Sequence, residues 1–392
     1  LFGWEDAQGN WTTGHMDYFV NEFRGPATFV DARFRLAADA IKNLGFKIKP
    51  YITAEGKTLY ALAPWEGSAF QAMGLGLSLA EKESPSWREL LGNAVAIEVD
   101  FAARKGLPGF LSESYTGVGV QYTGAVGIPE ITVSPRPRIT DAASLYSLGV
   151  AYTIDPETTE RFLAANWPTI SSLFTDHGPW EGYNAARREA IRFQTTAHTL
   201  SLILGLLGTG PANMKRYVDH ARLGERLSEH FRPGVATDLL SPDSNAFAWA
   251  NKDGRIRSGR QGEAFRVEGD EIRLLGIAFV PKGSETDNLS GGHLRIRYRT
   301  RGAIDPVVIQ LKPEGFRPDS GLIPKEIFTR FADTAGREEE ITIPLPATVG
   351  LSRIKEVVMS HERPTASPTV DLTVTRLDFV PALPAAGQGA SR

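Results

Sequence analysis

The chain has 392 residues, more than one typical domain contains, so we expect two domains. Its formal net charge is -3 with acidic and basic residues interspersed, which gives no reason to expect a nucleic acid or an anionic membrane as partner. The absence of cysteine excludes disulfides, thiolate-bound zinc and cysteine nucleophiles. No apolar run reaches membrane-spanning length, so no membrane span is predicted.

From residue 1 to about 231, helical patterns alternate with loops. The spacing of apolar residues predicts helices over 15–23, 29–44, 68–80, 86–104, 140–152, 156–174, 184–207 and 211–230. A short hairpin is expected at 46–63, around Glu55 and Gly56. A long loop rich in Gly and Tyr follows from 106 to 138, and loops of this length in a compact domain are usually functional.

The predicted helices differ in character in a regular way. Three are apolar on nearly all sides and rich in small residues: 68–80, 142–152 and the end of 184–207. Three others carry charges on one side: 86–104, 156–174 and 211–230. The first kind suits an inner layer and the second a solvated outer layer. Antiparallel hairpins that alternate in this way build an (α/α) toroid, in which the loops before the inner helices share one end.

A Trp-Glu-Gly motif precedes two of the expected inner helices, at Trp65-Glu66-Gly67 and Trp180-Glu181-Gly182, and Trp4-Glu5-Asp6 is a weaker copy. An aromatic ring beside a carboxylate suits a sugar-binding groove, because the apolar face of a sugar stacks on the ring while the acid binds hydroxyls or transfers protons. The same motif also suits a helix start, where Glu is favoured by the helix dipole and Trp packs against the first turn. Both interpretations stay open.

The second half of the chain has a different pattern. From residue 262, short β-branched segments are punctuated by Gly, Pro and Asp, which predicts an antiparallel, jelly-roll-like β-sandwich over 262–380. The segment 232–261 is expected to be a linker and 381–392 a disordered tail. The predicted fold is therefore multidomain, α then β, with an (α/α) toroid of helical hairpins over 1–231 followed by the sandwich.

Five short motifs of the first half are distinctive: Asn21-Glu-Phe23, Pro64-Trp-Glu-Gly-Ser-Ala-Phe-Gln71, Gly106-Leu-Pro-Gly-Phe-Leu-Ser-Glu-Ser-Tyr115, Thr140-Asp-Ala-Ala-Ser-Leu-Tyr146 and Thr195-Thr-Ala-His-Thr-Leu200. They resemble bacterial α/α-toroid proteins of the glucoamylase-like and β-1,2-glucanase-like kind, some of which belong to cell-envelope polysaccharide machinery. The resemblance covers about residues 1–230 and implies a periplasmic or secreted location. Such six-hairpin toroids have twelve helices and eight are predicted here, so either two hairpins lie upstream of Leu1 or the toroid is open.

The chemistry of a glycoside hydrolase requires two carboxyl groups, roughly 5–5.5 Å apart in retaining and 6.5–9.5 Å apart in inverting enzymes. We predict Glu66 and Glu181 as the acid–base pair, with Glu113 as the third candidate. The substrate-binding candidates are the possible stacking residues and two polar side chains: Trp65, Trp180, Tyr183, Tyr115, Trp11, Glu22 and Arg188. A Trp in a helical domain can instead belong to the core.

The function these residues predict is that of a glycoside hydrolase or transglycosidase acting on a bacterial envelope or exopolysaccharide glucan. The alternative is a non-catalytic polysaccharide-binding or assembly protein, in which the acids accept sugar hydroxyls. The expected partners are a poly- or oligosaccharide and other polysaccharide-synthesis or export proteins. No metal or cofactor is expected, because the histidines lack a zinc-binding spacing. Linkage, anomer, endo or exo mode and stereochemical outcome stay open.

Overall fold

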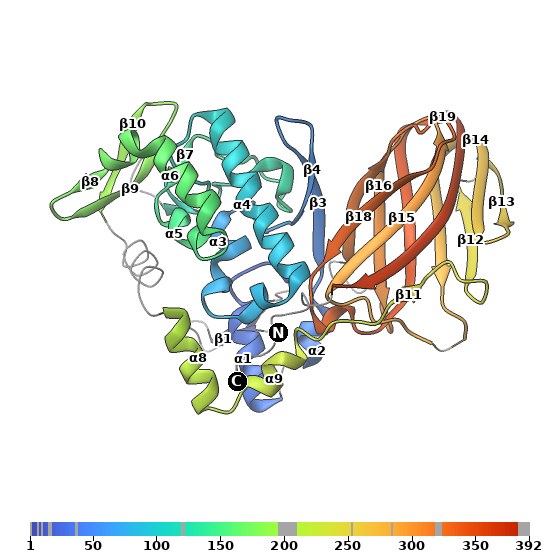
Figure 1. Ribbon diagram of the computed structural model, residues 1–392, viewed down its shortest axis with the longest axis horizontal. Coiled ribbons are helices and arrows are strands. Elements are labelled where there is room, and N and C mark those ends of the chain that lie inside the picture. Colours follow the sequence, from blue (N-terminus) through green and yellow to red (C-terminus); the bar gives the residue numbers. More distant parts are fainter. Residues whose placement is uncertain are drawn as a thin grey trace.

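The computed structural model describes residues 2–5, 8, 11–14, 18–35, 38–118, 122–194, 210–251, 254–283, 285–317 and 324–382. The chain forms a mainly helical lobe from its first half and a large curved sheet from its second half (Figure 1). The predicted (α/α) toroid is wrong: strand exceeds helix, 39% against 28%, and the largest unit is a mixed sheet. Among the described residues, no helix has the length and apolar character needed to cross a membrane.

The helices of the first lobe surround one long central helix. They are α1 (Arg24–Phe34), α2 (Ala38–Asn43), α3 (Ala69–Met73), α4 (Pro85–Lys105), α5 (Tyr146–Tyr152), α6 (Pro156–Ser171), α8 (Gly210–His220) and α9 (Gly224–Glu229). The central helix is α4, which begins with Pro85 at a first-turn position, where the missing N–H costs nothing. It packs against α3, α6 and strand β4, and its side chains Trp87, Leu91 and Val95 are buried.

Strands replace the inner helix expected over 184–207. Strands β7 (Ala142–Ser144), β8 (Phe174–Thr175), β9 (Gly178–Asn184) and β10 (Glu189–Gln194) form a four-stranded sheet at the edge of the lobe. Residues 195–209 lie outside the described part of the chain. The second Trp-Glu-Gly motif is therefore inside strand β9 and not at a helix start, and α5 begins only at Tyr146, after β7. Within 184–194, Ile191 is buried while Glu189 and Arg192 are exposed, and the pairing of β10 with β9, which determines the strand, has no local sequence signal.

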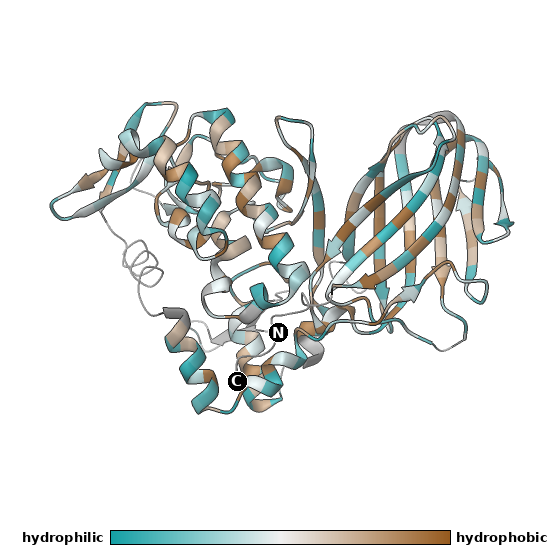
Figure 2. Cartoon of the chain, viewed as in Figure 1, coloured by the Kyte–Doolittle hydropathy of each residue, from teal (hydrophilic) through white to brown (hydrophobic). Residues whose placement is uncertain are grey.

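Within the described ranges, the large sheet contains eleven strands. They are β3 (Phe46–Ile52), β4 (Thr58–Leu62), β11 (Thr237–Asp238), β12 (Asn245–Ala250), β13 (Arg255–Gln261), β14 (Ala264–Val280), β15 (Gly292–Arg301), β16 (Ile304–Pro313), β17 (Lys325–Phe331), β18 (Glu339–Leu345) and β19 (Ile354–Pro381). Strand β19 pairs with β14 and β16 along its first part and with β14 and β15 along its last part. Figure 2 shows hydrophobic and hydrophilic residues alternating along these strands, as expected when one face is buried.

The predicted hairpin at 46–63 is confirmed, because β3 and β4 pair antiparallel. It also joins the second half of the chain: β3 pairs parallel with β17, so the sheet is mixed and the expected purely antiparallel sandwich is wrong. Parallel pairing between distant segments has no local sequence signal. Two further contacts connect the halves, since Trp87 Nε1 donates to the Ala347 carbonyl at 2.8 Å and Lys325 Nζ donates to the Lys42 carbonyl at 2.8 Å.

The segment 232–261, expected as a linker, contains strands β11, β12 and β13 of the large sheet. Pro381 ends strand β19, and residues 383–392 of the expected disordered tail lie outside the described part of the chain. The division into domains at 231 and 262 stays a prediction.

Candidate active site

Glu66 lies in the loop between β4 and α3, and this loop is fixed by main-chain contacts. The Trp65 carbonyl accepts hydrogen bonds from segment 132–134 at 2.8 to 3.2 Å. Gly67 has φ of 73°, and a Cβ there would lie 2.6 Å from a backbone oxygen, so the turn requires glycine. The Glu66 N–H donates to Gln71 Oε1 at 2.9 Å, from the first turn of α3. These contacts hold the acid in a defined position.

The carboxylate of Glu66 is paired with Arg138. Arg138 donates through one guanidinium nitrogen to Glu66 Oε2, through another to Ser134 Oγ at 3.3 Å, and through Nε to the Arg136 carbonyl at 2.9 Å. The Arg138 side chain is 1% exposed and that of Glu66 20%. Burial lowers the pKa of Arg138, but a guanidinium stays charged at any physiological pH. An adjacent cation favours the charged form of a carboxyl group, so this pair suits a carboxylate role for Glu66.

Glu113 lies in the long loop after α4, directly before strand β5 (Ser114–Tyr115). Its backbone is anchored by Tyr146, whose hydroxyl lies 2.8 Å from the Glu113 carbonyl and 2.7 Å from Ser112 Oγ. Ser112 Oγ is 2.9 Å from Ser68 Oγ, beside the Glu66 loop. A buried network of hydroxyls therefore connects the loops that carry the two acids.

The electrostatic surroundings of Glu113 favour its protonated form. Burial is the main cause that raises the pKa of its carboxyl, and the charge of Glu22 raises it further. A hydrogen bond with Tyr122 acts in the opposite direction. A carboxyl group whose pKa lies above its usual range is suited to donate a proton near neutral pH.

Glu66 and Glu113 approach each other at Gly124. A Cβ at Gly124 would lie 3.9 Å from Glu113 Oε2 and 3.9 Å from Glu66 Cγ. These two atoms are therefore no farther apart than twice that distance. The sequence paired Glu66 with Glu181 and gave Glu113 only as the third candidate, and Gly124 between the loops of Glu66 and Glu113 carried no recognisable signal.

Glu181 belongs to the same cluster but is fully buried. Its side chain on β9 is 0% exposed and accepts a hydrogen bond from Ser114 Oγ at 2.7 Å, while its carbonyl accepts the Leu145 N–H at 3.0 Å. Its charge still contributes to the raised pKa values of Tyr122 and Tyr146. Glu181 therefore lies against Ser114 of strand β5, within electrostatic range of Tyr122 and Tyr146 and away from solvent.

Aromatic rings border the acids on the side of strand β6 (Tyr122–Thr123). Burial raises the pKa of the Tyr122 hydroxyl, and the charge of Glu113 and its hydrogen bond raise it further. The Tyr122 ring meets Tyr115 edge-on at 5.7 Å, and Tyr115 stacks on Phe193 at 4.3 Å with an interplanar angle of 11°. Trp65, next to Glu66 in the chain, is 36% exposed, and its ring meets Tyr18 edge-on at 5.6 Å. The site thus has exposed ring surface beside its carboxyl groups.

Several predicted site residues lie elsewhere or make only indirect contact. Glu22 precedes α1 and acts on Glu113 and Tyr122 through its charge, whereas the neighbouring Arg24 forms a buried ion pair with Glu81 at 2.7 Å. Residues 11–14 form strand β2 (Trp11–Gly14), and the Trp11 side chain lies outside the described part of the chain.

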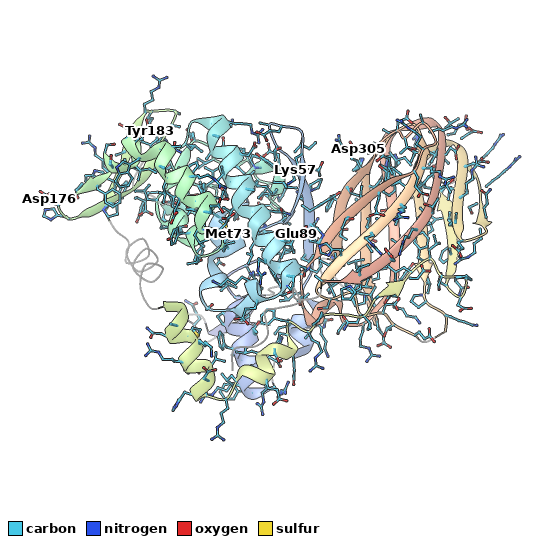
Figure 3. The ribbon with its side chains drawn as sticks, viewed as in Figure 1. Lys57, Met73, Glu89, Asp176, Tyr183 and Asp305 are labelled. Atoms are coloured by element: carbon cyan, nitrogen blue, oxygen red, sulfur yellow. The ribbon has the colours of Figure 1, made fainter. Side chains whose placement is uncertain are left out.

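The remaining predicted residues belong to the β8–β10 region. Trp180 is partly buried against the core, and Tyr183 lies on the same face of β9 as Glu181. Arg188 is exposed in the turn between β9 and β10, with φ of 54°. Tyr183 and Asp176 both project from this region, Asp176 at the outer tip of the β8–β9 hairpin (Figure 3).

Two residues of the site were not predicted from the sequence. Arg138 and Tyr122 contact the carboxyl groups of Glu66 and Glu113. Both belong to the long loop over 106–138, whose Gly- and Tyr-rich composition was the available signal. Within the described ranges, no group of three or more Asp, Glu or His side chains has an arrangement that could hold a metal ion.

Comparison with known protein families and with curated proteins gives no match. Among solved structures, the chain is similar to an endo-β-1,2-glucanase from Talaromyces funiculosus in complex with sophorose, with TM-score 0.43, 17% identity, and coverage of 56% of this chain and 47% of that chain. A mutant of that enzyme with β-1,2-glucan gives TM-score 0.40, 17% identity, and coverage of 57% and 49%. A family 29 carbohydrate binding module from Piromyces equi gives TM-score 0.27, 8% identity, and coverage of 37% and 89%. The chain thus spans about half the length of the glucanase structures.

Proposed function

We propose that this protein is a glycoside hydrolase that acts on a glucan, with Glu113 as the proton donor and Glu66 as the second carboxylate. The observation that carries the proposal is the contrast between the two acids beside Gly124. Burial and the charge of Glu22 raise the pKa of Glu113, whereas Glu66 is paired with a buried guanidinium. Two neighbouring carboxyl groups whose surroundings favour opposite protonation states are the requirement for acid–base cleavage of a glycosidic bond.

In this proposal Glu113 protonates the leaving oxygen. Glu66 either activates a water molecule, which gives inversion, or attacks the anomeric carbon, which gives retention. Tyr122 orients Glu113 through their hydrogen bond, and the rings of Trp65 and Tyr115 offer surfaces for sugar stacking. The stereochemistry of the first product distinguishes the two roles of Glu66.

Glu181 has a different role from the one its motif suggested. Its burial and its hydrogen bond from Ser114 support a positioning role, in which it holds strand β5 next to Glu113. The pair Glu66–Glu181 stays the competing assignment. It requires Glu181 to reach the substrate, so the same variants test both assignments.

We further propose that the natural substrate is a bacterial envelope or exopolysaccharide glucan, and that the protein acts in the periplasm or outside the cell. The resemblance of motifs such as 64–71 and 106–115 supports this choice. A non-catalytic polysaccharide-binding protein is the alternative outcome. The glucan panel for testing contains soluble β-1,2-, β-1,3- and mixed-linked β-1,3-1,4-glucans and glycogen, with β-1,2-glucan tested first.

The test measures release of reducing ends from the glucan panel by the full chain and by Glu113→Gln, Glu66→Gln and Glu181→Gln. A matched control is Glu157→Gln, an exposed acid of α6. Because general acid–base catalysis contributes about 10²–10⁴-fold, Glu113→Gln and Glu66→Gln should lower turnover by at least 10²-fold while the control stays active. Binding without release by the unmodified chain supports the non-catalytic alternative.

A further inference from the structure

Strand β12 carries its large aromatic side chains on the outside. Phe247 is 51% exposed and Trp249 partly exposed, whereas Ala246, Ala248 and Ala250 pack against the hydrophobic core. Successive residues of a strand face opposite sides, so the two rings share one face. A half-buried strand normally directs its large apolar residues inward and its polar residues outward. This inverted order leaves apolar ring area exposed on the outer face of β12, and contiguous exposed apolar area is a feature of binding surfaces.

The Trp249 ring is held in a fixed orientation. Trp249 lies opposite Gly276 of β14, and a Cβ at Gly276 would be 2.1 Å from the indole ring. The indole therefore lies directly on the backbone of β14, which only glycine permits. The Phe247 ring is 5.9 Å from it, with an interplanar angle of 38°. The two rings form neighbouring platforms on a strand that ends the path of the sheet.

Hydrogen-bonding side chains follow on the same face of the sheet. In register, Gly276 lies opposite Ser360 of β19, and Ser360 lies opposite Val308 of β16. The row that starts at Phe247 continues through the small or buried residues Ala278 and Val358 to Gln310 of β16. Gln310 Nε2 donates to Glu326 Oε1 at 3.0 Å, and Glu326 Oε2 lies 3.2 Å from Lys47 Nζ. Rings followed by hydroxyl, amide and carboxylate groups match a chain of pyranose sugars, which presents apolar faces and hydroxyl edges together.

We propose that Phe247 and Trp249 form a second glucan-binding surface, distinct from the acid cluster. Strand β12 lies on the side of the sheet away from the helical lobe, so one polysaccharide chain can be held there while another segment is cleaved at Glu113 (Figure 1). The sugar rings stack on Trp249 and Phe247. The identity of the ligand as a glucan rests on the proposed function, whereas the surface itself rests on the geometry of β12.

The experiment uses the full chain carrying Glu113→Gln, so that no glucan is consumed, and measures retardation in native gels containing each member of the glucan panel. Adding Trp249→Ala or Phe247→Ala should weaken the apparent affinity about tenfold for each lost ring. The matched control is Trp167→Ala, which removes from helix α6 an aromatic ring whose exposure, 54%, is close to the 51% of Phe247. Circular dichroism of each variant checks folding, and Phe247→Ala provides the test if Trp249→Ala unfolds.

Unchanged retardation of both β12 variants, or no retardation of the parent by any glucan, overturns the inference. It is also overturned if Phe247→Ala leaves glucan binding intact and abolishes a self-association seen by analytical ultracentrifugation, because β12 would then be an interface between copies of the chain. If glucan binding by the Glu113→Gln chain depends on Trp249 while the unmodified chain releases no reducing ends from any glucan, the result supports this inference and contradicts the proposed hydrolase. Failure of the glucan-binding surface and failure of the proposed hydrolase therefore give different results.

Discussion

Glu66 and Glu113 come from loops 47 residues apart and border the same glycine, since a Cβ at Gly124 would lie 3.9 Å from a side-chain atom of each. A glycosidase needs its scissile bond between two carboxyl groups. The space beside Gly124 is therefore where added bulk should affect activity more than folding.

We predict that Gly124→Ala folds normally, because 3.9 Å is an ordinary van der Waals contact, and that Gly124→Val lowers kcat/KM for glucan at least tenfold by filling the space between the acids. Gly259→Val is the matched control, since a Cβ at Gly259 meets no atom within 4 Å. Steady-state kinetics and thermal unfolding of the three variants check this. Equal kcat/KM of Gly124→Val and Gly259→Val would contradict a site shared by Glu66 and Glu113 beside Gly124.

Tyr122→Phe should shift the pH dependence of catalysis. The hydrogen bond from Tyr122 lowers the pKa of Glu113, so its loss raises that pKa further. A general acid must be protonated to act, so the alkaline limb of the kcat/KM profile moves to higher pH. Tyr115→Phe, on the paired strand, is the control. A limb that moves to lower pH, or does not move, contradicts the role of Glu113 as the acid.

Glu98 makes stability depend on pH independently of the site chemistry. It is buried on α4, accepts the Leu111 N–H at 3.0 Å, and burial raises its pKa from 4.5 to about 8. Between these two pKa values the folded state keeps the proton that the unfolded state has lost. The contribution of Glu98 to the free energy of unfolding is therefore fully present below about pH 4.5, and the free energy of unfolding falls by about 1.4 kcal/mol per pH unit as the pH rises to about 8. Glu98→Gln should abolish this decline in urea unfolding at pH 5.5, 7 and 8.5. Parallel pH profiles of the two proteins would show that Glu98 ionises normally.

The Arg138–Glu66 pair should couple strongly in folding. Removing one partner of a buried ion pair leaves the other charge uncompensated, so Arg138→Met should cost roughly 3 kcal/mol, and the additional Glu66→Gln change should recover part of that loss. The exposed pair Arg161–Glu157 is the control and should couple by only about 0.3–0.5 kcal/mol. Urea unfolding in two double-mutant cycles gives both values. Similar coupling free energies in the two cycles would mean that water screens the Arg138–Glu66 pair as it screens an exposed pair.

The sequence identified some residues of the candidate site, Glu66 and Glu113 among them, but it paired Glu66 with Glu181, which the structure buries completely, and it did not identify Arg138 or Tyr122. The Trp-Glu-Gly loop, the long aromatic loop and the acids Glu66 and Glu113 were recognisable because their residue types carry the chemistry. The pairing of Glu66 with Arg138 was not, because it joins residues 72 apart through a loop without periodicity.

The fold was predicted less well, for two physical reasons. Residues 189–194, expected near the start of the helix over 184–207, form strand β10, because they pair with β9, and this pairing between segments has no local sequence signal. The parallel pairing of β3 with β17 joins segments almost 280 residues apart, and nothing local specifies it. The toroid followed from assigning the apolar segments of the first half outside the 46–63 hairpin to helices.

The central claim is that Glu113 donates the proton to the leaving oxygen. The most direct measurement compares kcat/KM of the unmodified chain and Glu113→Gln on the glucan that is cleaved best and on a dinitrophenyl glycoside of its disaccharide, whose leaving group needs no protonation. We predict a loss of at least 10²-fold on the glucan and less than tenfold on the aryl glycoside. Equal losses on both substrates, or full activity of Glu113→Gln on the glucan, would contradict the account.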